Sequence, residues 1–264
     1  MATLPGGYWD GNNCLRSYNF RPLTGELELA IIEADRRSAS LPVRVSLILE
    51  AALESLFANK PSYDAIHDLS VVDRQYLMRE LALMLGHDGF WHTEVCNSCE
   101  NEFDFEIINS QFPVGLAGET YPYISLETSQ GKQQFRVPTG RDQEIIMTSV
   151  YTQKTDSPEK VLANLCLCAN KLMDFSEDDI KRIDLALEDV SPGVVTRISA
   201  ACPECEEVHE IELDPYYLLD VDIESDLFES IHAVASAYHW SEADIFRLNR
   251  RRRQMYIDMI ERDL

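Results

Sequence analysis

Apolar residues recur at helical spacing in two early segments of the chain, and each segment carries a start or a stop signal. Pro42 lies in the first turn of the earlier segment, and Gly86 follows the later one. Proline is tolerated in a first turn, and glycine ends many helices. The pattern therefore predicts two core helices. Their apolar positions are Val45, Ile48, Leu49, Ala52 and Leu56 in the first, and Leu77, Leu81, Met84 and Leu85 in the second.

Capping signals predict two further helices in the second half. Ser157 precedes Pro158 as an N-cap before a first-turn proline, and Ser176 with Asp179 has the spacing of a capping box. An apolar stripe follows each signal. The stripes consist of Val161, Leu165, Cys168 and Leu172, and of Ile180, Ile183 and Leu187.

Strict alternation of apolar and polar residues predicts a strand over 103–107 and another over 208–213. Residues 112–136 are rich in proline and glycine, which indicates turns and short strands, with Phe135 and Val137 near the end of one. Helical segments and short strands in one chain predict the α+β class.

The C-terminal region has a pattern of its own. A helix is predicted from Glu224 onward, and His239-Trp240 forms a hinge before a second capping pattern at Ser241 and Asp244. The apolar face of the first helix consists of Leu227, Ile231, Val234, Ala235 and Tyr238. A basic helix over 247–264 then closes the tail.

The composition describes a globular chain of 264 residues, with 45% hydrophobic and 26% charged residues. Its formal charge of −23 makes non-specific nucleic-acid binding unfavourable and favours a partner with basic patches. Residues 247–264 carry six arginines and three acids, so they contribute +3 and the other residues −26. No signal peptide is evident, and no stretch approaches the roughly 18 apolar residues of a membrane span. The cytoplasm of a bacterial cell is the expected location.

Four of the seven cysteines form two Cys-x-x-Cys pairs, separated by 102 residues. Such a turn brings two sulfurs together, and two turns complete the tetrahedron that zinc prefers. Because a strand follows each pair, the arrangement is that of two zinc-ribbon-like β-hairpins joined by one structural Zn²⁺. The predicted ligands are Cys96, Cys99, Cys202 and Cys205.

Other interpretations of the cysteines remain open. The four could be buried free thiols, since cysteine is common in cores, and His92 or His209 could replace one ligand. A redox pair is disfavoured because neither pair opens a helix after a strand. Cys166 and Cys168 lie in a helical stripe, where packing is the expected role of Cys168, and Cys14 has no evident partner.

A weak internal repeat divides the chain. Residues 21–28 (Arg-Pro-Leu-Thr-Gly-Glu-Leu-Glu) are echoed by residues 137–144 (Val-Pro-Thr-Gly-Arg-Asp-Gln-Glu), and helical patterns and a Cys-x-x-Cys pair follow each copy. Duplication and chance similarity are both compatible with this pattern. Four segments are predicted: an N-terminal segment over 1–20, a first half over 21–135, a second half over 136–222 and a helical tail over 223–264.

The basic tail is the predicted partner-binding region. Four consecutive arginines occupy every side of a helical turn, so they pair with acidic groups of a partner, of another copy or of the chain itself, or remain solvated. An aromatic residue in the hinge could anchor in a partner's pocket. The candidate residues are Trp240, Arg250, Arg251, Arg252, Arg253 and Tyr256.

Known catalytic patterns are largely missing from the sequence. His92-Thr93-Glu94 and Ala201-Cys202-Pro203-Glu204-Cys205 superficially resemble the His-x-Glu and Pro-Cys-x-x-Cys signature of zinc deaminases. However, alanine precedes the first cysteine, and the two elements lie more than a hundred residues apart. No glycine-rich phosphate loop, nucleophile elbow or His-Glu-x-x-His helix is present. The sequence therefore predicts a protein without catalytic activity.

The order of these motifs resembles a protein encoded in contractile phage tail and extracellular contractile injection clusters, a group similar to the baseplate hub assembly proteins of contractile-tailed phages. The shared features are the Arg-Pro-Leu-Thr-Gly start, Asp73-Arg74, the two cysteine pairs, Pro138-Thr139-Gly140, and a closing Tyr-His-Trp-Ser-Glu with Arg-Arg-x-x-Tyr. The resemblance implies a non-enzymatic subunit or assembly chaperone whose partners are other tail or baseplate proteins. The arginine tail adds a second copy of the chain as a candidate partner.

One departure concerns the first pair, which lacks the proline and glycine typical of such knuckles, so that Asn97 or Glu100 is expected to adopt the turn. The competing function class is a zinc-ribbon adaptor in transcription or nucleic-acid metabolism, which needs a basic or aromatic face on a knuckle. The acids around the cysteines favour the assembly role. They are Glu100, Glu102, Asp104, Glu204, Glu206 and Glu207.

Overall fold

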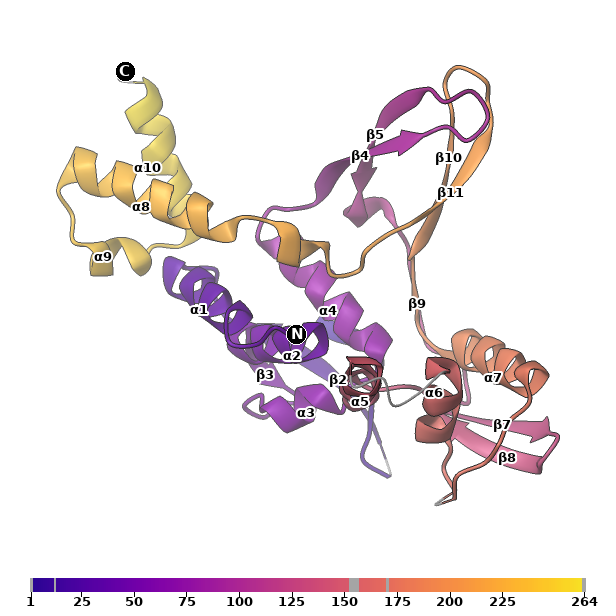
Figure 1. Ribbon diagram of the computed structural model, residues 1–264. Coiled ribbons are helices and arrows are strands. Elements are labelled where there is room, and N and C mark those ends of the chain that lie inside the picture. Colours follow the sequence, from indigo (N-terminus) through magenta and orange to yellow (C-terminus); the bar gives the residue numbers. More distant parts are fainter. Residues whose placement is uncertain (1, 12, 152–156, 170, 263–264) are drawn as a thin grey trace. The chain divides into compact units, whose positions relative to one another are not determined.

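The computed structural model describes residues 2–11, 13–151, 157–169 and 171–262. In this part the chain is a mixed α+β protein of helices and small antiparallel sheets (Figure 1). It forms two compact units. The first comprises Met1–Ala2, Ser17–Ile66 and Leu219–Leu264, and the second Thr3–Arg16 and His67–Leu218. The four segments defined from the sequence follow chain order instead, and their boundaries stay a prediction.

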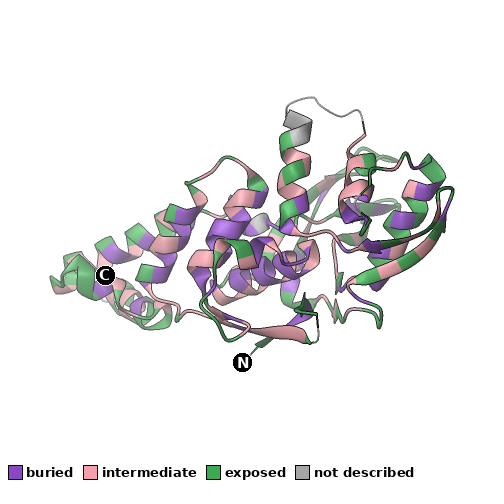
Figure 2. Cartoon of the chain, turned by 90° about the horizontal axis from the view of Figure 1, so that it is seen from below, coloured by how far each residue is buried: buried purple, intermediate pink, exposed green. Residues whose placement is uncertain are grey.

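The first unit is mainly helical. Its elements are α1 (Gly25–Asp35), α2 (Leu41–Ala52), β3 (Leu53–Leu56), α8 (Ile223–Tyr238), α9 (Glu242–Phe246) and α10 (Arg250–Arg262), with the end of β2 (Cys14–Phe20) and most of α3 (Tyr63–His67). Helix α1 packs against α2, α8 and α9, and α10 packs against α8. Buried, intermediate and exposed residues alternate along the helices of the chain (Figure 2).

Most of the helix starts and ends predicted for the first unit are found in the structure. Helix α2 carries Pro42 in its first turn, as expected, but the chain leaves the helix at Ala52, and Leu56 belongs to a strand that pairs with β2. The hinge after Tyr238 is confirmed, because α8 ends there and His239 adopts a left-handed φ of 57°. Ser241 caps α9, and α10 begins at Arg250, three residues later than predicted.

The second unit contains the remaining elements. They are β1 (Ala2–Trp9), α4 (Val71–Met84), β4 (Gly89–Val95), β5 (Glu102–Ile108), the 3₁₀ turn η1 (Asn109–Gln111), β6 (Val114–Gly115), β7 (Tyr123–Thr128), β8 (Gly131–Arg136), α5 (Gly140–Tyr151), α6 (Pro158–Cys166), α7 (Glu177–Val190), β9 (Gly193–Val194), β10 (Arg197–Ala201), β11 (Val208–Glu212) and the 3₁₀ turn η2 (Tyr217–Asp220), which ends in the first unit.

A core around Phe135 and Phe175 joins the β7–β8 hairpin to α6 and α7. Ser157 caps α6, and the capping box of Ser176 is complete, as predicted. The stripe expected to reach Leu172 is shorter, because α6 ends at Cys166, so Cys168 and Leu172 lie outside the helix and are exposed. Buried Cys166 lies in this core, which raises the pKa of its thiol to about 12.

Within the described residues, every helix is too short or too polar to cross a lipid bilayer.

Candidate metal centre

Each Cys-x-x-Cys pair forms the turn of an antiparallel hairpin. Strands β4 and β5 pair up to Val95 and Glu102, and β10 and β11 pair up to Ala201 and Val208. The two hairpins lie side by side with their turns together (Figure 1). The alternation in the sequence therefore correctly predicts both following strands, and each turn projects two sulfurs at a hairpin tip.

The two turns have the same backbone hydrogen bonds. In the first, the amide of Cys96 donates to Asn101 at 2.9 Å and the amide of Glu100 donates to Cys96 at 2.9 Å. In the second, Cys202 donates to Glu207 at 2.8 Å and Glu206 to Cys202 at 2.9 Å. The same local structure is thus built twice.

A glutamate occupies the left-handed position of each turn. The φ angle is 60° at Glu100 and 62° at Glu206. Glycine is the usual residue in this conformation, because a Cβ atom makes it unfavourable for other residues. Of the two residues expected to adopt the turn in the first pair, Glu100 is the one with positive φ.

The four cysteine sulfurs gather at one point. All lie within 4.8 Å of one another, with 3.5 Å between the sulfurs of Cys96 and Cys205 and 3.7 Å between those of Cys99 and Cys202. These distances exceed a disulfide bond of about 2.05 Å. Four sulfurs around a tetrahedral ion at about 2.3 Å would lie about 3.8 Å apart. The cluster therefore has the donor type and spacing of a metal site.

Little apolar packing supports this cluster. Cys96 and Cys202 are 0% and 1% exposed and form a small core with Phe103, against which Phe105 and Ala200 pack. Cys99 and Cys205 are exposed. Three buried residues form a very small core, so a metal ion would supply much of the force that holds the hairpins together.

The thiols influence one another's protonation. Hydrogen bonds from the backbone amides of Cys99 and Ser98 lower the pKa of Cys96 to about 6. The backbone amide of Asn101 favours the Cys99 thiolate too, but the sulfurs of Cys205, Cys96 and Cys202 raise the pKa of Cys99 to about 12. Cysteines bind a metal ion as thiolates. The positive charge of an ion at the centre would offset the repulsion between the four negatively charged sulfurs.

The two histidines near the cysteines occupy different positions. His209 Nε2 lies 3.4 Å from Cys96 Sγ and is buried beside Phe103, so it neighbours one sulfur of the cluster. His92 Nε2 lies 3.4 Å from Glu94 Oε2, and its ring contacts Phe105. Among the described residues, the group that could hold a metal consists of the four cysteines.

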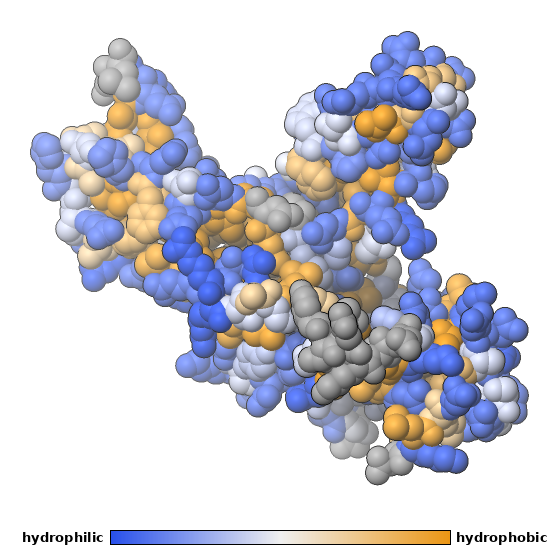
Figure 3. Space-filling view, viewed as in Figure 1, coloured by the Kyte–Doolittle hydropathy of each residue, from blue (hydrophilic) through white to orange (hydrophobic). Residues whose placement is uncertain are grey.

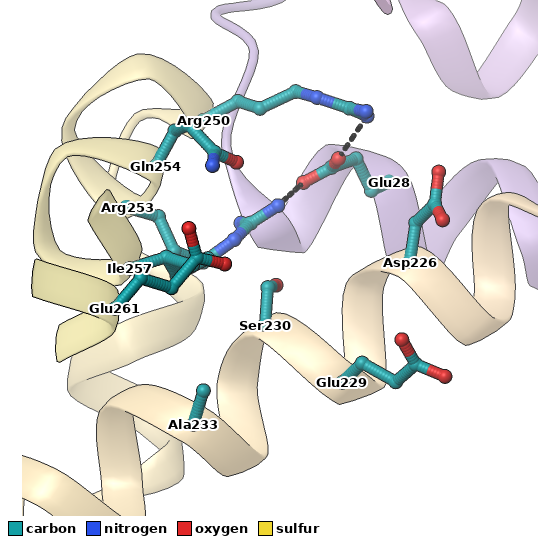
Figure 4. A pocket seen from close by; sticks show the side chains of 10 residues that line it. All are labelled: Glu28, Asp226, Glu229, Ser230, Ala233, Arg250, Arg253, Gln254, Ile257 and Glu261. Atoms are coloured by element: carbon teal, nitrogen blue, oxygen red, sulfur yellow. Dashed lines mark hydrogen bonds and ion pairs between the residues drawn. The ribbon is translucent and has the colours of Figure 1, made fainter. Parts of the chain in front are cut away.

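The predicted partner-binding residues divide into two sets. Arg250 donates to Glu28 Oε1 at 2.6 Å and Arg253 to Glu28 Oε2 at 2.5 Å, along a pocket that α8 also lines (Figure 4). Arg253 is 3% and Glu28 1% exposed. These two arginines therefore hold α10 against α1. Arg251 and Arg252 are exposed, and Trp240 and Tyr256 stack edge to face at 4.9 Å.

Glu28 is an important residue that the sequence interpretation missed. It lies on the apolar face of α1, three and four residues before Ile31 and Ile32. A carboxylate among buried apolar positions needs a cationic partner. The position of Glu28 among apolar residues was the signal in the sequence that could have predicted a buried ion pair. The run of arginines at 250–253 contained its cationic partners.

Comparisons with protein-family models, with curated proteins and with solved structures find no match to this chain. The assignment of the metal centre therefore depends on the geometry and chemistry of the four cysteines.

Proposed function

We propose that the four cysteines bind one structural zinc ion. Four thiolates form the donor set that zinc prefers in closed sites, and the sulfur spacing suits its tetrahedron. The acidic surroundings would not compete well with sulfur for this ion. Because Cys96, Cys99, Cys202 and Cys205 would complete the coordination, no position would remain for substrate or water, and the role of the ion would be structural.

For the protein as a whole, we propose a non-enzymatic structural or chaperone-like role in assembling the baseplate of a contractile phage tail or phage-tail-like injection system. The observation that carries this proposal is the order of short motifs along the chain. Its partners would be other tail or baseplate proteins, and it would act in the bacterial cytoplasm. Both a subunit that stays in the finished particle and a chaperone that is released fit this role.

The surface of the paired hairpins supports a protein-binding role over a nucleic-acid adaptor. Hydrophilic residues cover most of its visible face (Figure 3). On β5, the exposed residues are Glu102, Asp104 and Glu106, and each lies opposite an exposed residue of β4. Clustered carboxylates repel phosphate groups. A zinc-ribbon adaptor would need a basic or aromatic face here. Of the β4 residues opposite these acids, Trp91 is aromatic, and the others are Thr93 and Val95.

Metal content tests the zinc proposal directly. The purified chain should contain about one zinc ion, and a variant with Cys202→Ser and Cys205→Ser should contain none. Cys168→Ser is the matched control, because this exposed cysteine lies outside the cluster and should leave the metal content unchanged. Equal metal content in the double variant and the control would exclude the site.

Particle assembly tests the wider role. Deleting the gene from a host that produces a contractile particle should leave incomplete particles in electron micrographs, and the wild-type gene should restore them. The double cysteine variant should fail to do so. Complete, contractile particles without the gene would refute the assembly role and leave the zinc proposal intact.

A further inference from the structure

A segment of ten residues occurs twice in the chain with the same spacing of key positions. Each copy contains Ile-x-x-Leu, then serine or asparagine, then x-x-x-Arg-Gln. The copies are Ile66, Leu69, Ser70, Arg74 and Gln75, and Ile245, Leu248, Asn249, Arg253 and Gln254. Each spans the end of a five-residue helix, α3 or α9, and the start of a long one, α4 or α10.

In the second unit, this segment docks on the Thr-Gly turn at the start of α5. Ser70 forms an isolated β-bridge with Thr139, and the amide of Val71 donates to Pro138 at 3.0 Å. Arg74 lies against Gly140 so closely that a Cβ atom there would be 2.2 Å from its guanidinium.

In the first unit, the other copy docks on the Thr-Gly turn at the start of α1 in the same way. Asn249 forms a β-bridge with Thr24, and the amide of Arg250 donates to Leu23 at 2.9 Å. A Cβ atom on Gly25 would lie 3.1 Å from the guanidinium of Arg253. Both the Thr-Gly turn and its docking helix are thus duplicated, and residues of α4 and α10 can be matched one to one.

Within the part of the chain that the structure describes, a segment covers one face of α4, and the matching face of α10 is exposed. On α4, the third residue after the bridge is Asp73, which is 0% exposed. Its carboxylate accepts hydrogen bonds from the amides of Gly6 and Gly7 at 2.9 and 2.8 Å, and Tyr121 donates to it at 3.3 Å. An extended segment of β1 therefore covers this face of α4 through its backbone amides.

The corresponding residue of α10 is Arg252, and its surroundings are open. Arg252 is exposed and lies over the ring of Tyr256, with 6.0 Å between guanidinium carbon and ring centroid. The same surface presents Met255 and Met259, which are 52% and 46% exposed, and neighbouring Trp240. Arginine donates hydrogen bonds where aspartate accepts them. An amide N–H could therefore not pair with Arg252, and a carboxylate could.

We propose that this face of α10, formed by Arg251, Arg252, Met255, Tyr256 and Met259, binds an extended segment of a partner protein that carries a carboxylate opposite Arg252. The partner segment would lie as β1 lies on α4, with the charge reversed. Apolar side chains of the segment would cover the two methionines, and the carboxylate would pair with the guanidinium. This inference adds a partner chemistry to the proposed assembly role and does not depend on the zinc ion.

The β1 segment itself supplies the probe. One synthetic peptide has the sequence of residues 3–9, and a second carries Gly6→Asp. Titrated into the ¹⁵N-labelled full chain, the acidic peptide should shift the amide signals of Arg252 and Met255 and bind about tenfold more tightly than the unaltered one, as expected for one charge-assisted hydrogen bond.

Arg252→Asp should reverse the order of the two affinities. It places on α10 the residue that α4 has at the matching position, and an aspartate favours the unaltered peptide, which offers two glycine amides. Arg252→Gln should abolish the preference. Arg197→Asp is the control, since it makes the same charge change on β10, and it should keep the tenfold preference. The proposal is overturned if the acidic peptide leaves the α10 signals unshifted, or if Arg252→Asp keeps the wild-type order.

Discussion

The candidate metal centre of the second unit and the ion-paired contact of α1 with α10 in the first unit bring distant parts of the chain together by different chemistry. Cys96 and Cys205 are 109 residues apart, and Glu28 and Arg253 are 225 apart. Cys96 and Cys202 lie with Phe103 in a core of three buried residues, and Cys99 and Cys205 are exposed. Glu28 instead lies on a helix with buried Leu27, Ile31 and Ile32.

This difference shows how the surroundings determine what a connection contributes. Two hairpins whose cysteines share a core of only three buried residues would depend on an ion that can be removed, so their stability would follow metal supply. Glu28 and Arg253 are buried beside the apolar residues of α1, where the loss of one partner would leave an unpaired buried charge. The contact between the two hairpins should therefore depend on bound metal, and the contact between α1 and α10 should not.

Metal removal should have the largest effect. Chelation, or the Cys202→Ser and Cys205→Ser variant, should disorder β4–β5 and β10–β11, since binding free energy on the order of 10 kcal/mol is coupled to folding in small zinc domains. Hydrogen exchange should accelerate in these strands and stay unchanged in α1 and α10. Equal acceleration in both units would contradict the comparison.

Loss of Glu28 should have the next largest effect, confined to the first unit. Glu28→Ala leaves buried Arg253 without its carboxylate, which should lower the free energy of unfolding by about 3 kcal/mol. Denaturant unfolding measures this loss, and zinc content should not change. Glu33→Ala, on the exposed face of α1, is the control and should cost less than about 0.5 kcal/mol. Similar costs for the two variants would show that the ion pair is dispensable.

The duplicated Thr-Gly turn allows the two units to be compared at matched positions. Gly140→Ala would place a Cβ atom 2.2 Å from the guanidinium of fully buried Arg74 and should cost about 2 kcal/mol. Gly25→Ala meets Phe246 at 2.9 Å and Arg253 at 3.1 Å, so its cost should be smaller. Thermal unfolding of both variants would test this order, and a larger loss for Gly25→Ala would contradict it.

A glycine at the left-handed position should raise the stability of both cysteine turns by a similar amount. Glu100→Gly and Glu206→Gly each relieve a left-handed non-glycine residue and should stabilise the zinc-loaded hairpins by about 1 kcal/mol. Glu204→Gly, in the same turn as Glu206 but without a positive φ, should bring no gain. Melting temperatures of the metal-loaded proteins measure the difference. A gain at Glu204 equal to that at Glu206 would point to relief of charge repulsion instead.

Local features of the fold were predictable from neighbouring residues. The capping box at Ser176, the proline start of α2 and the strands after each cysteine pair all depend on contacts within a few positions. The end of α6 was not predictable in this way. Its apolar stripe continues in sequence to Leu172, yet the amide of Cys168 donates to Gln134 at 2.9 Å, so pairing beside β8 replaces the last helical turn.

The same distinction between local and distant contacts applies to the candidate functional residues. The sequence by itself determined which four sulfurs could share an ion, because a Cys-x-x-Cys turn is closed by its own backbone hydrogen bonds. It could not tell Arg253 from Arg252, since neighbours in one arginine run have the same local signal. Only the tertiary structure decided that Arg253 is buried against Glu28 and Arg252 faces outward, because burial of a charge depends on a carboxylate that lies 225 residues away in the chain.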